Sequence, residues 1–200
     1  MRQDFVSQGL LVAAFSLGLA APALAQTPTP AAAAAPASQA APTPAPAPTP
    51  APGDVASSDA IVAALYEVIS GDADVQRDWD RFRSLFHPSG RLVPIGQPAE
   101  GPATLRILTP DEYIARAEPF LMRGFHEREI ARRVEHFGGL THVFSTYDSR
   151  HTASDPEPFA RGINSIQLFD DGQRWWIVSI YWQSETPAFP LPADYLPPAT

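Results

Sequence analysis

The side chains best suited to chemistry lie on two neighbouring segments, residues 125–137 and 140–150. Both segments are long and β-prone, and the Gly-Gly pair between them predicts a hairpin with a two-residue turn. In that register Glu129 lies directly opposite Asp148. Two close carboxylates push one pKa upward, and a carboxyl group of raised pKa can act as a general acid. The alternative is an exposed lattice of charges in which nearby arginines neutralise the acids.

A second group of side chains could line a ligand pocket. A two-residue turn places part of this group on one face of the first hairpin, and the same rule applied to residues 162–185 places the rest on one face of a second hairpin. A pocket needs mainly apolar walls with a few convergent polar groups. The residues that fit best are Arg132, Ser145, Tyr147, Asn164, Trp175 and Tyr181. The alternative is a half-buried sheet whose polar atoms satisfy one another. In this register Glu127 and Glu129 point to the opposite face.

Several motifs of known chemistry do not occur in the sequence. It has no HExxH, no pair of histidines at metal spacing, no Gly-rich phosphate loop and no nucleophile elbow. We therefore expect no metal and no cofactor, and no catalytic residue can be assigned. The formal net charge of −8 argues against a nucleic-acid or anionic-membrane partner.

Helices followed by strands are expected in the folded part. Apolar spacing and capping residues predict helices over 57–70, 75–86 and 109–124, the last beginning with the capping box Thr109-Pro110-Asp111-Glu112. Short strands are expected over 91–95 and 104–108. Four longer strands are expected over 125–137, 140–150, 161–169 and 174–185. Helices first and then a long sheet indicate the α+β class, here a curved antiparallel sheet packed on about three N-terminal helices.

The last predicted hairpin, GINSIQLFDDGQRWWIVSIYWQSE over 162–185, carries large apolar residues on both faces. Helices and a pocket can cover one face only. The other face suggests a partner sheet, and a homodimer through the sheet is the simplest arrangement.

This hairpin resembles the last hairpin of the nuclear transport factor 2-like (SnoaL-like) superfamily. The segments LFHPSGRLVP (85–94) and HVFSTYDS (142–149) resemble the same family. The resemblance covers roughly 60–185 and implies a cone-like half barrel with an internal pocket. The superfamily includes ketosteroid isomerase, cyclases, ligand carriers and dimerisation modules. The Asp base of ketosteroid isomerase has no clear counterpart in 91–108, so the resemblance implies no particular reaction.

The two ends of the chain differ from its middle in composition. Residues 1–25 have the features of a signal peptide cleaved after Ala25, and an uncleaved anchor is the alternative. Residues 26–54 are almost wholly Ala, Pro and Thr, which predicts a disordered linker. The domain then covers 55–185 and a Pro-rich tail covers 186–200, which either straps across the domain or a dimer mate or is frayed. With no Cys, the exported domain must hold by packing alone.

These features favour a periplasmic or secreted, non-catalytic, dimeric module with a hydrophobic pocket for a small molecule. The alternatives are a cofactor-free lyase, isomerase or hydrolase acting on a small hydrophobic substrate, and a purely structural module on a Pro-rich stalk. One observation distinguishes the binding module from the enzyme: whether an Asp, Glu or His points into an enclosed cavity.

Overall fold

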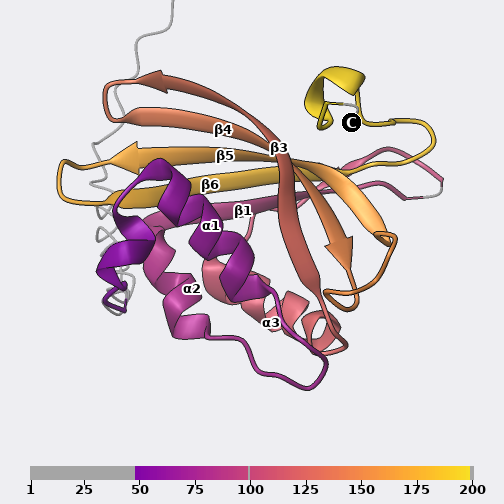
Figure 1. Cartoon of the computed structure of the whole chain (residues 1–200), viewed down its shortest axis with the longest axis horizontal. Helices are drawn as coiled ribbons and strands as arrows, with labels where there is room; N and C mark the ends of the chain where they lie inside the picture. The colour runs from indigo at the N-terminus through magenta and orange to yellow at the C-terminus, as the bar shows by residue number, and fades with distance from the viewer. Residues whose placement is uncertain (1–47, 99, 199–200) are drawn as a thin grey trace, which may run out of the picture. The chain divides into compact units, whose positions relative to one another are not determined.

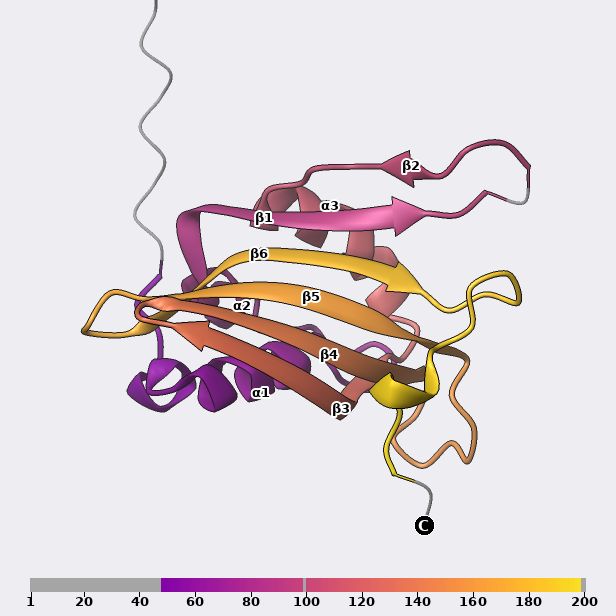
Figure 2. The same ribbon diagram turned by 90° about the horizontal axis from the view of Figure 1, so that it is seen from above.

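Six strands form one curved, unclosed sheet (Figure 2). In the computed structural model, which describes residues 48–98 and 100–198, their order across the sheet is β2-β1-β6-β5-β4-β3. Neighbouring strands are antiparallel except for β1 and β6, which run parallel. The strands are β1 (Phe86–Gly96), β2 (Thr104–Leu105), β3 (His126–Phe137), β4 (Leu140–Arg150), β5 (Ala160–Asp170) and β6 (Trp175–Ser184).

Three α-helices lie against one face of this sheet (Figure 1). They are α1 (Ser58–Ile69), α2 (Trp79–Leu85) and α3 (Pro110–Leu121), with short 3-10 helices at Pro52–Val55 and Ala193–Tyr195. The predicted α+β class, with a curved sheet on three helices, is confirmed. Among the described residues no helix is long and apolar enough to cross a membrane.

Local capping signals set where the helices begin. Thr109 accepts a hydrogen bond from the Glu112 backbone and Glu112 accepts one from the Thr109 backbone, so the predicted capping box is confirmed. The second helix is shorter than predicted because Asp78 caps it and the first helical residue is Trp79. Upstream of that cap, Val75 is exposed.

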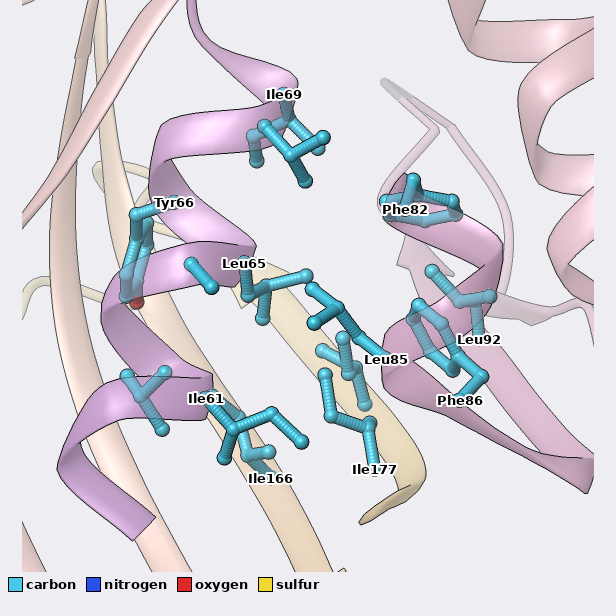
Figure 3. Packing of buried hydrophobic residues seen from close by; sticks show 14 of the residues in the cluster. Ile61, Leu65, Tyr66, Ile69, Phe82, Leu85, Phe86, Leu92, Ile166 and Ile177 are labelled. Carbon is cyan, nitrogen blue, oxygen red and sulfur yellow. The ribbon is translucent and has the colours of Figure 1, made fainter. Parts of the chain in front are cut away.

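The core lies between the helices and the inner face of the sheet, which we define as the face the helices cover. Figure 3 shows α1 placing Ile61 and Leu65 toward Ile166 and Ile177 of the sheet, with Phe82 of α2 across from them. All five side chains are almost completely buried. Burial of an aliphatic or aromatic side chain of this size contributes about 1.5–3 kcal/mol, so this layer fixes the helices over the sheet.

A buried arginine joins the ends of two helices. Arg77 donates hydrogen bonds to five backbone carbonyls, which include Ile69 at the end of α1, Gly71 in the following loop and Leu121 at the end of α3. Its guanidinium satisfies carbonyl groups that helix ends leave without partners. Arg77 therefore links the end of α3 to the end of α1.

The turn of the first hairpin is as predicted, but the register changes within its strands. Phe137 pairs with Leu140 across the Gly138-Gly139 turn. Further along, Ala131 pairs with Thr146 while Glu129 pairs with Tyr147, so Ile130 is the extra residue of a β-bulge. Beyond the bulge each side chain of β3 lies on the face opposite to the one predicted.

The expected pairing of Glu129 with Asp148 is therefore wrong. Arg128 is the residue opposite Asp148 and binds it at 3.0 Å, while Arg150 binds the other oxygen of the same carboxylate, also at 3.0 Å. Glu129 instead faces the helices, opposite Tyr147.

The second hairpin differs from the prediction twice. Its loop has four residues, because Asp170 pairs with Trp175. Beyond that loop Leu168 pairs with Ile177, but Gln167 then pairs with Ser179, so Val178 is a second bulge residue.

The described part of the tail crosses the outer face of the sheet, the face away from the helices. The Thr146 hydroxyl donates to the Tyr195 carbonyl at 2.7 Å, and the Tyr195 ring lies 5.1 Å from that of Phe144. At the other end, Asp54 accepts hydrogen bonds from Arg81 and Val55 is buried, so ordered structure begins inside the last residues of the predicted linker. The rest of that linker, 26–47, and the predicted signal peptide lie outside the described residues.

Candidate ligand-binding site

A cavity of about 310 Å³ lies between α1, α3 and the inner face of the sheet. Its walls are mainly apolar, and the polar side chains Tyr113, Glu127, Tyr147, Ser149, Asn164 and Ser184 reach into it. The apolar wall is built from Leu65, Ile69, Leu92, Ala117, Phe120, Leu121, Phe125, Phe159, Ala160, Ile180 and Trp182. A mainly apolar cavity with a few polar groups is the usual form of a small-molecule site.

Glu127 is the carboxyl group of this cavity, and the bulge at Ile130 turns it inward. Its carboxylate accepts a hydrogen bond from the Ser149 hydroxyl at 2.8 Å, and its backbone N–H donates to the Ser70 hydroxyl at 2.9 Å. The side chain keeps some accessible surface because it faces the cavity, while protein encloses its other sides.

That enclosure raises the pKa of Glu127 from near 4.5 to about 7. Burial is the main cause, hydrogen bonds from Ser149 and Asn164 oppose it, and the charge of Asp148 adds to it. Both protonation states of Glu127 are therefore populated near neutral pH. The carboxyl can donate a hydrogen bond in one state and accept one, or accept a proton, in the other.

Two phenols share the cavity with this carboxyl. The Tyr147 hydroxyl lies 3.1 Å from the Ser184 hydroxyl, and burial raises the pKa of Tyr147 to about 12. Burial also raises the pKa of Tyr113, with the charge of Glu127 as a further cause. Within the described residues the Tyr113 hydroxyl has no hydrogen-bond partner. It is therefore a donor available to a molecule in the cavity.

The missing side chain of Gly162 leaves the space that the Tyr147 ring occupies. The two residues pair across β4 and β5, and a Cβ on Gly162 would lie 2.5 Å from the phenol oxygen. Real Cβ atoms do not come this close to other atoms. A glycine is required here for the Tyr147 ring to cross the neighbouring strand.

The structure brings only some of the predicted pocket residues together. Tyr147 and Asn164 line the cavity. Arg132 and Ser145 lie on the same face of the sheet but outside the cavity, where Arg132 pairs with Glu129 and Asp59 and Ser145 is fully buried.

Trp175 and Tyr181 do not reach the cavity. Trp175 packs against the core near the turn of the second hairpin. The predicted face of Tyr181 was wrong, because the bulge at Val178 places Tyr181 opposite Ser165 on the outer face. There it lines a separate groove beneath the tail. Trp182 takes the inward position, opposite Asn164.

Tyr113, Glu127 and Trp182 are among the cavity side chains that the predicted pocket did not include. Tyr113 lies on the inward side of α3, as helical spacing indicates, but it was not assigned to the pocket. Glu127 and Trp182 depend on the two bulges, and neither bulge residue is a glycine that would have signalled one.

Aromatic side chains lie at the surface end of the cavity. Phe120 at the end of α3 and Phe159 before β5 have ring centroids 6.1 Å apart, and both also approach Phe125. They are 37% and 42% exposed while lining the cavity. The cavity thus reaches the surface between the end of α3 and the β4–β5 loop. In the described ranges, no three His, Asp or Glu side chains gather as metal ligands would.

Comparisons with known proteins found similarity in structure only. Protein-family models and curated proteins gave no match to the sequence. A solved protein of unknown function with a cystatin-like fold from Nostoc punctiforme has a TM-score of 0.49 and 12% identity, covering 66% of this chain and 90% of that one.

Two further solved structures have lower TM-scores. A protein from Parabacteroides distasonis, provisionally assigned as a ketosteroid isomerase, has a TM-score of 0.43 and 12% identity, covering 65% of this chain and 89% of that one. An NTF2-like protein of unknown function from Shewanella baltica has a TM-score of 0.39 and 12% identity, covering 65% and 98%. What this site can do therefore rests on its own residues.

Proposed function

We propose that the domain binds a small, mainly apolar molecule that carries at least one hydroxyl or carbonyl group. The observation that carries the proposal is the cavity itself. Its walls are apolar, and Glu127, Tyr113 and Tyr147 project into the same space. A purely apolar ligand would leave the Tyr113 hydroxyl without a partner, which costs about 1–3 kcal/mol.

The binding test uses 2-naphthol and naphthalene as probes, followed by quenching of tryptophan fluorescence. Trp182 lines the cavity and reports on occupancy. We expect 2-naphthol to bind more tightly than naphthalene, because its hydroxyl can pair with the cavity's polar groups. Equal affinity for the two probes would contradict the hydrogen-bonding part of the proposal.

A matched pair of variants on α3 locates the binding. Ala117 lines the cavity, whereas Ala115 is exposed on the same helix. Ala117→Phe fills part of the cavity and should weaken 2-naphthol binding at least tenfold, and Ala115→Phe should leave it unchanged. Equal effects of the two variants would place the probe elsewhere.

A second candidate function, a cofactor-free lyase or isomerase, is favoured by one observation. Glu127 lines a cavity that is open to the surface at one end, and it has a pKa of about 7, which suits a group that takes and returns a proton at neutral pH. The ionised carboxylate would remove a proton next to a ligand carbonyl. The Tyr113 hydroxyl would then donate to the oxygen on which negative charge develops.

Deuterium exchange tests this second function. Cyclohexanone in D2O should lose its α-protons faster with the protein than with Glu127→Gln, as followed by proton NMR. Glu135→Gln is the control, because Glu135 is exposed on the same strand. If Glu127→Gln is as active as the wild type, proton transfer by Glu127 is excluded and binding remains.

We also propose that two copies associate through the outer face of the sheet. Phe137, Leu140 and Phe169 are exposed there, and Phe137 is 84% exposed. Light scattering at micromolar concentration should give the mass of a dimer, and Leu140→Glu should give a monomer. A monomeric wild type would contradict this proposal.

Export is proposed from residues 1–25 alone, because their pattern is that of a cleavable signal peptide. N-terminal sequencing of the mature protein should begin at Gln26. A retained Met1 in the exported protein would instead support the uncleaved anchor.

A further inference from the structure

A chain of hydrogen bonds connects the cavity wall to the surface. Asn164 Nδ2 donates to the Tyr66 hydroxyl at 3.1 Å, and that hydroxyl lies 2.7 Å from Ser145 Oγ. Ser145 Oγ donates to Glu129 Oε2, and Arg132 Nε donates to Glu129 Oε1. Tyr66 and Ser145 are buried, so within the protein they rely on these partners. Figure 3 shows Tyr66 on the side of α1 next to the strands.

The direction of each hydrogen bond in this chain follows from its Glu129 end. A carboxylate only accepts, and Ser145 gives its one hydroxyl hydrogen to Glu129. Ser145 can therefore only accept from Tyr66. The Tyr66 hydroxyl hydrogen goes to Ser145, which leaves the Tyr66 oxygen to accept from Asn164.

The same argument fixes the amide of Asn164. Its nitrogen donates to Tyr66, and a hydrogen bond from this side chain to Glu127 lowers the pKa of Glu127. Only the amide nitrogen can donate to the ionised carboxylate, because an amide oxygen has no hydrogen to give. Both amide hydrogens are then in use. The carbonyl oxygen of Asn164, to which no described residue donates, is left for a ligand in the cavity.

We propose that Glu129 is a positioning residue which holds the Asn164 amide in one orientation, so that the cavity presents a hydrogen-bond acceptor at Asn164. A ligand with a hydroxyl or N–H group at this point is then favoured over one with a carbonyl group. The inference rests on the proposed function only where it treats the cavity as a ligand site.

The substitution Glu129→Gln should reverse the chain. Arg132 Nε requires an acceptor, so the amide oxygen of the new side chain must face Arg132 and its NH2 group must face Ser145. Ser145 then accepts a hydrogen bond from this NH2 group and donates its own hydrogen to Tyr66. Tyr66 in turn donates to Asn164. To receive this hydrogen, the Asn164 amide must turn its oxygen toward Tyr66, which changes its contact with Glu127.

The test is a carbon-13 NMR titration of the Glu127 carboxyl in the empty protein. When Asn164 no longer donates to Glu127, the pKa of Glu127 should rise by up to about one unit in Glu129→Gln, which is tenfold in the ionisation constant. The variant also removes a negative charge, which alone would lower this pKa, so a rise can come only from the lost donor. Glu135→Gln, on the exposed part of the same strand, should leave it unchanged. Asp148, Tyr113 and Tyr147, which also act on Glu127 or feel its charge, are the same in both variants. An equal Glu127 pKa in the two variants would overturn the proposal.

A second measurement needs no variant. In the wild type, exchange of the Asn164 side-chain amide hydrogens with solvent should be at least tenfold slower than in a free asparagine side chain. Exchange at the free rate would also overturn the proposal. Neither measurement involves a ligand, so failure of 2-naphthol to bind would contradict the proposed function without altering this result.

Discussion

The two hairpins of the sheet, β3–β4 and β5–β6, share a design but contribute different groups to the cavity. Each has one bulge, at Ile130 in the first and at Val178 in the second. The first bulge turns a carboxyl group, Glu127, into the cavity. The second turns Tyr181 out and brings Trp182 in. One extra residue in each hairpin thus decides which side chains of β3 and β6 face the cavity.

The largest expected effect is on stability, and it compares the bulge residue Val178 of the second hairpin with its neighbour Ile177. Ile177→Ala should cost about 2–5 kcal/mol in the free energy of unfolding, because Ile177 is completely buried. Val178→Ala should cost less than half as much, because Val178 is half-buried and lies at the bulge. Urea unfolding of both variants measures this difference. Similar losses would show that Val178 is as deeply packed as Ile177.

The carboxyl group of the first hairpin should make stability depend on pH. The pKa of Glu127 is higher in the folded chain, about 7, than its ordinary value near 4.5, so the folded state binds the proton more tightly. Its contribution to stability is present below about pH 4.5 and is lost as the pH rises through 7. The difference between these two pKa values corresponds to about 3 kcal/mol in the free energy of unfolding.

Chemical unfolding at several pH values tests this linkage against Glu127→Gln. The wild type should lose stability relative to the variant between pH 4.5 and 7. A constant difference across that range would mean that Glu127 titrates normally and is open to water.

A smaller effect is expected where the first hairpin meets the second, at Gly162 and Tyr147. Gly162→Ala should cost about 1–3 kcal/mol, because its Cβ would clash with the backbone oxygen of Gln183 and with the Tyr147 phenol. Combining it with Tyr147→Phe should recover part of that loss, because the phenol oxygen is one of the displaced atoms. Thermal unfolding of the single and double variants gives the coupling. Strict additivity would show that the two residues are not in contact.

The smallest expected effect is on ligand affinity, and it compares the adjacent aromatic residues Tyr181 and Trp182. Trp182→Ala should weaken 2-naphthol binding about fivefold, which is about 1 kcal/mol, while Tyr181→Ala should not change it. The wild-type tryptophan signal is lost in one variant, so isothermal calorimetry is the suitable measurement. A larger loss of affinity in Tyr181→Ala than in Trp182→Ala would contradict the bulge, because it would place Tyr181 in the cavity.

The elements were predictable because their signals are local. The capping box at Thr109 and the Gly138-Gly139 turn both depend on residues within a few positions of one another. The strands followed from β-branched and aromatic runs. The α+β fold class then followed from the order of these elements along the chain.

The site was less predictable because it depends on register, and a single bulge reverses every face beyond it. Tyr147 and Asn164 were placed correctly on the inner face, since neither lies beyond a bulge on its own strand. Glu127 and Tyr181 do lie beyond one and were assigned to the wrong faces. The packing that selects these bulges comes from other parts of the chain, so no local sequence pattern indicated them.

The clamp formed by Arg77 has a consequence for how the cavity responds to acid. Its partners are backbone carbonyls, which do not titrate, and an arginine stays charged throughout the physiological range. The link that Arg77 makes between the ends of α1 and α3 is therefore insensitive to pH over the range in which Glu127 gains or loses its proton. A proton can be taken up in the cavity without breaking this link beside it.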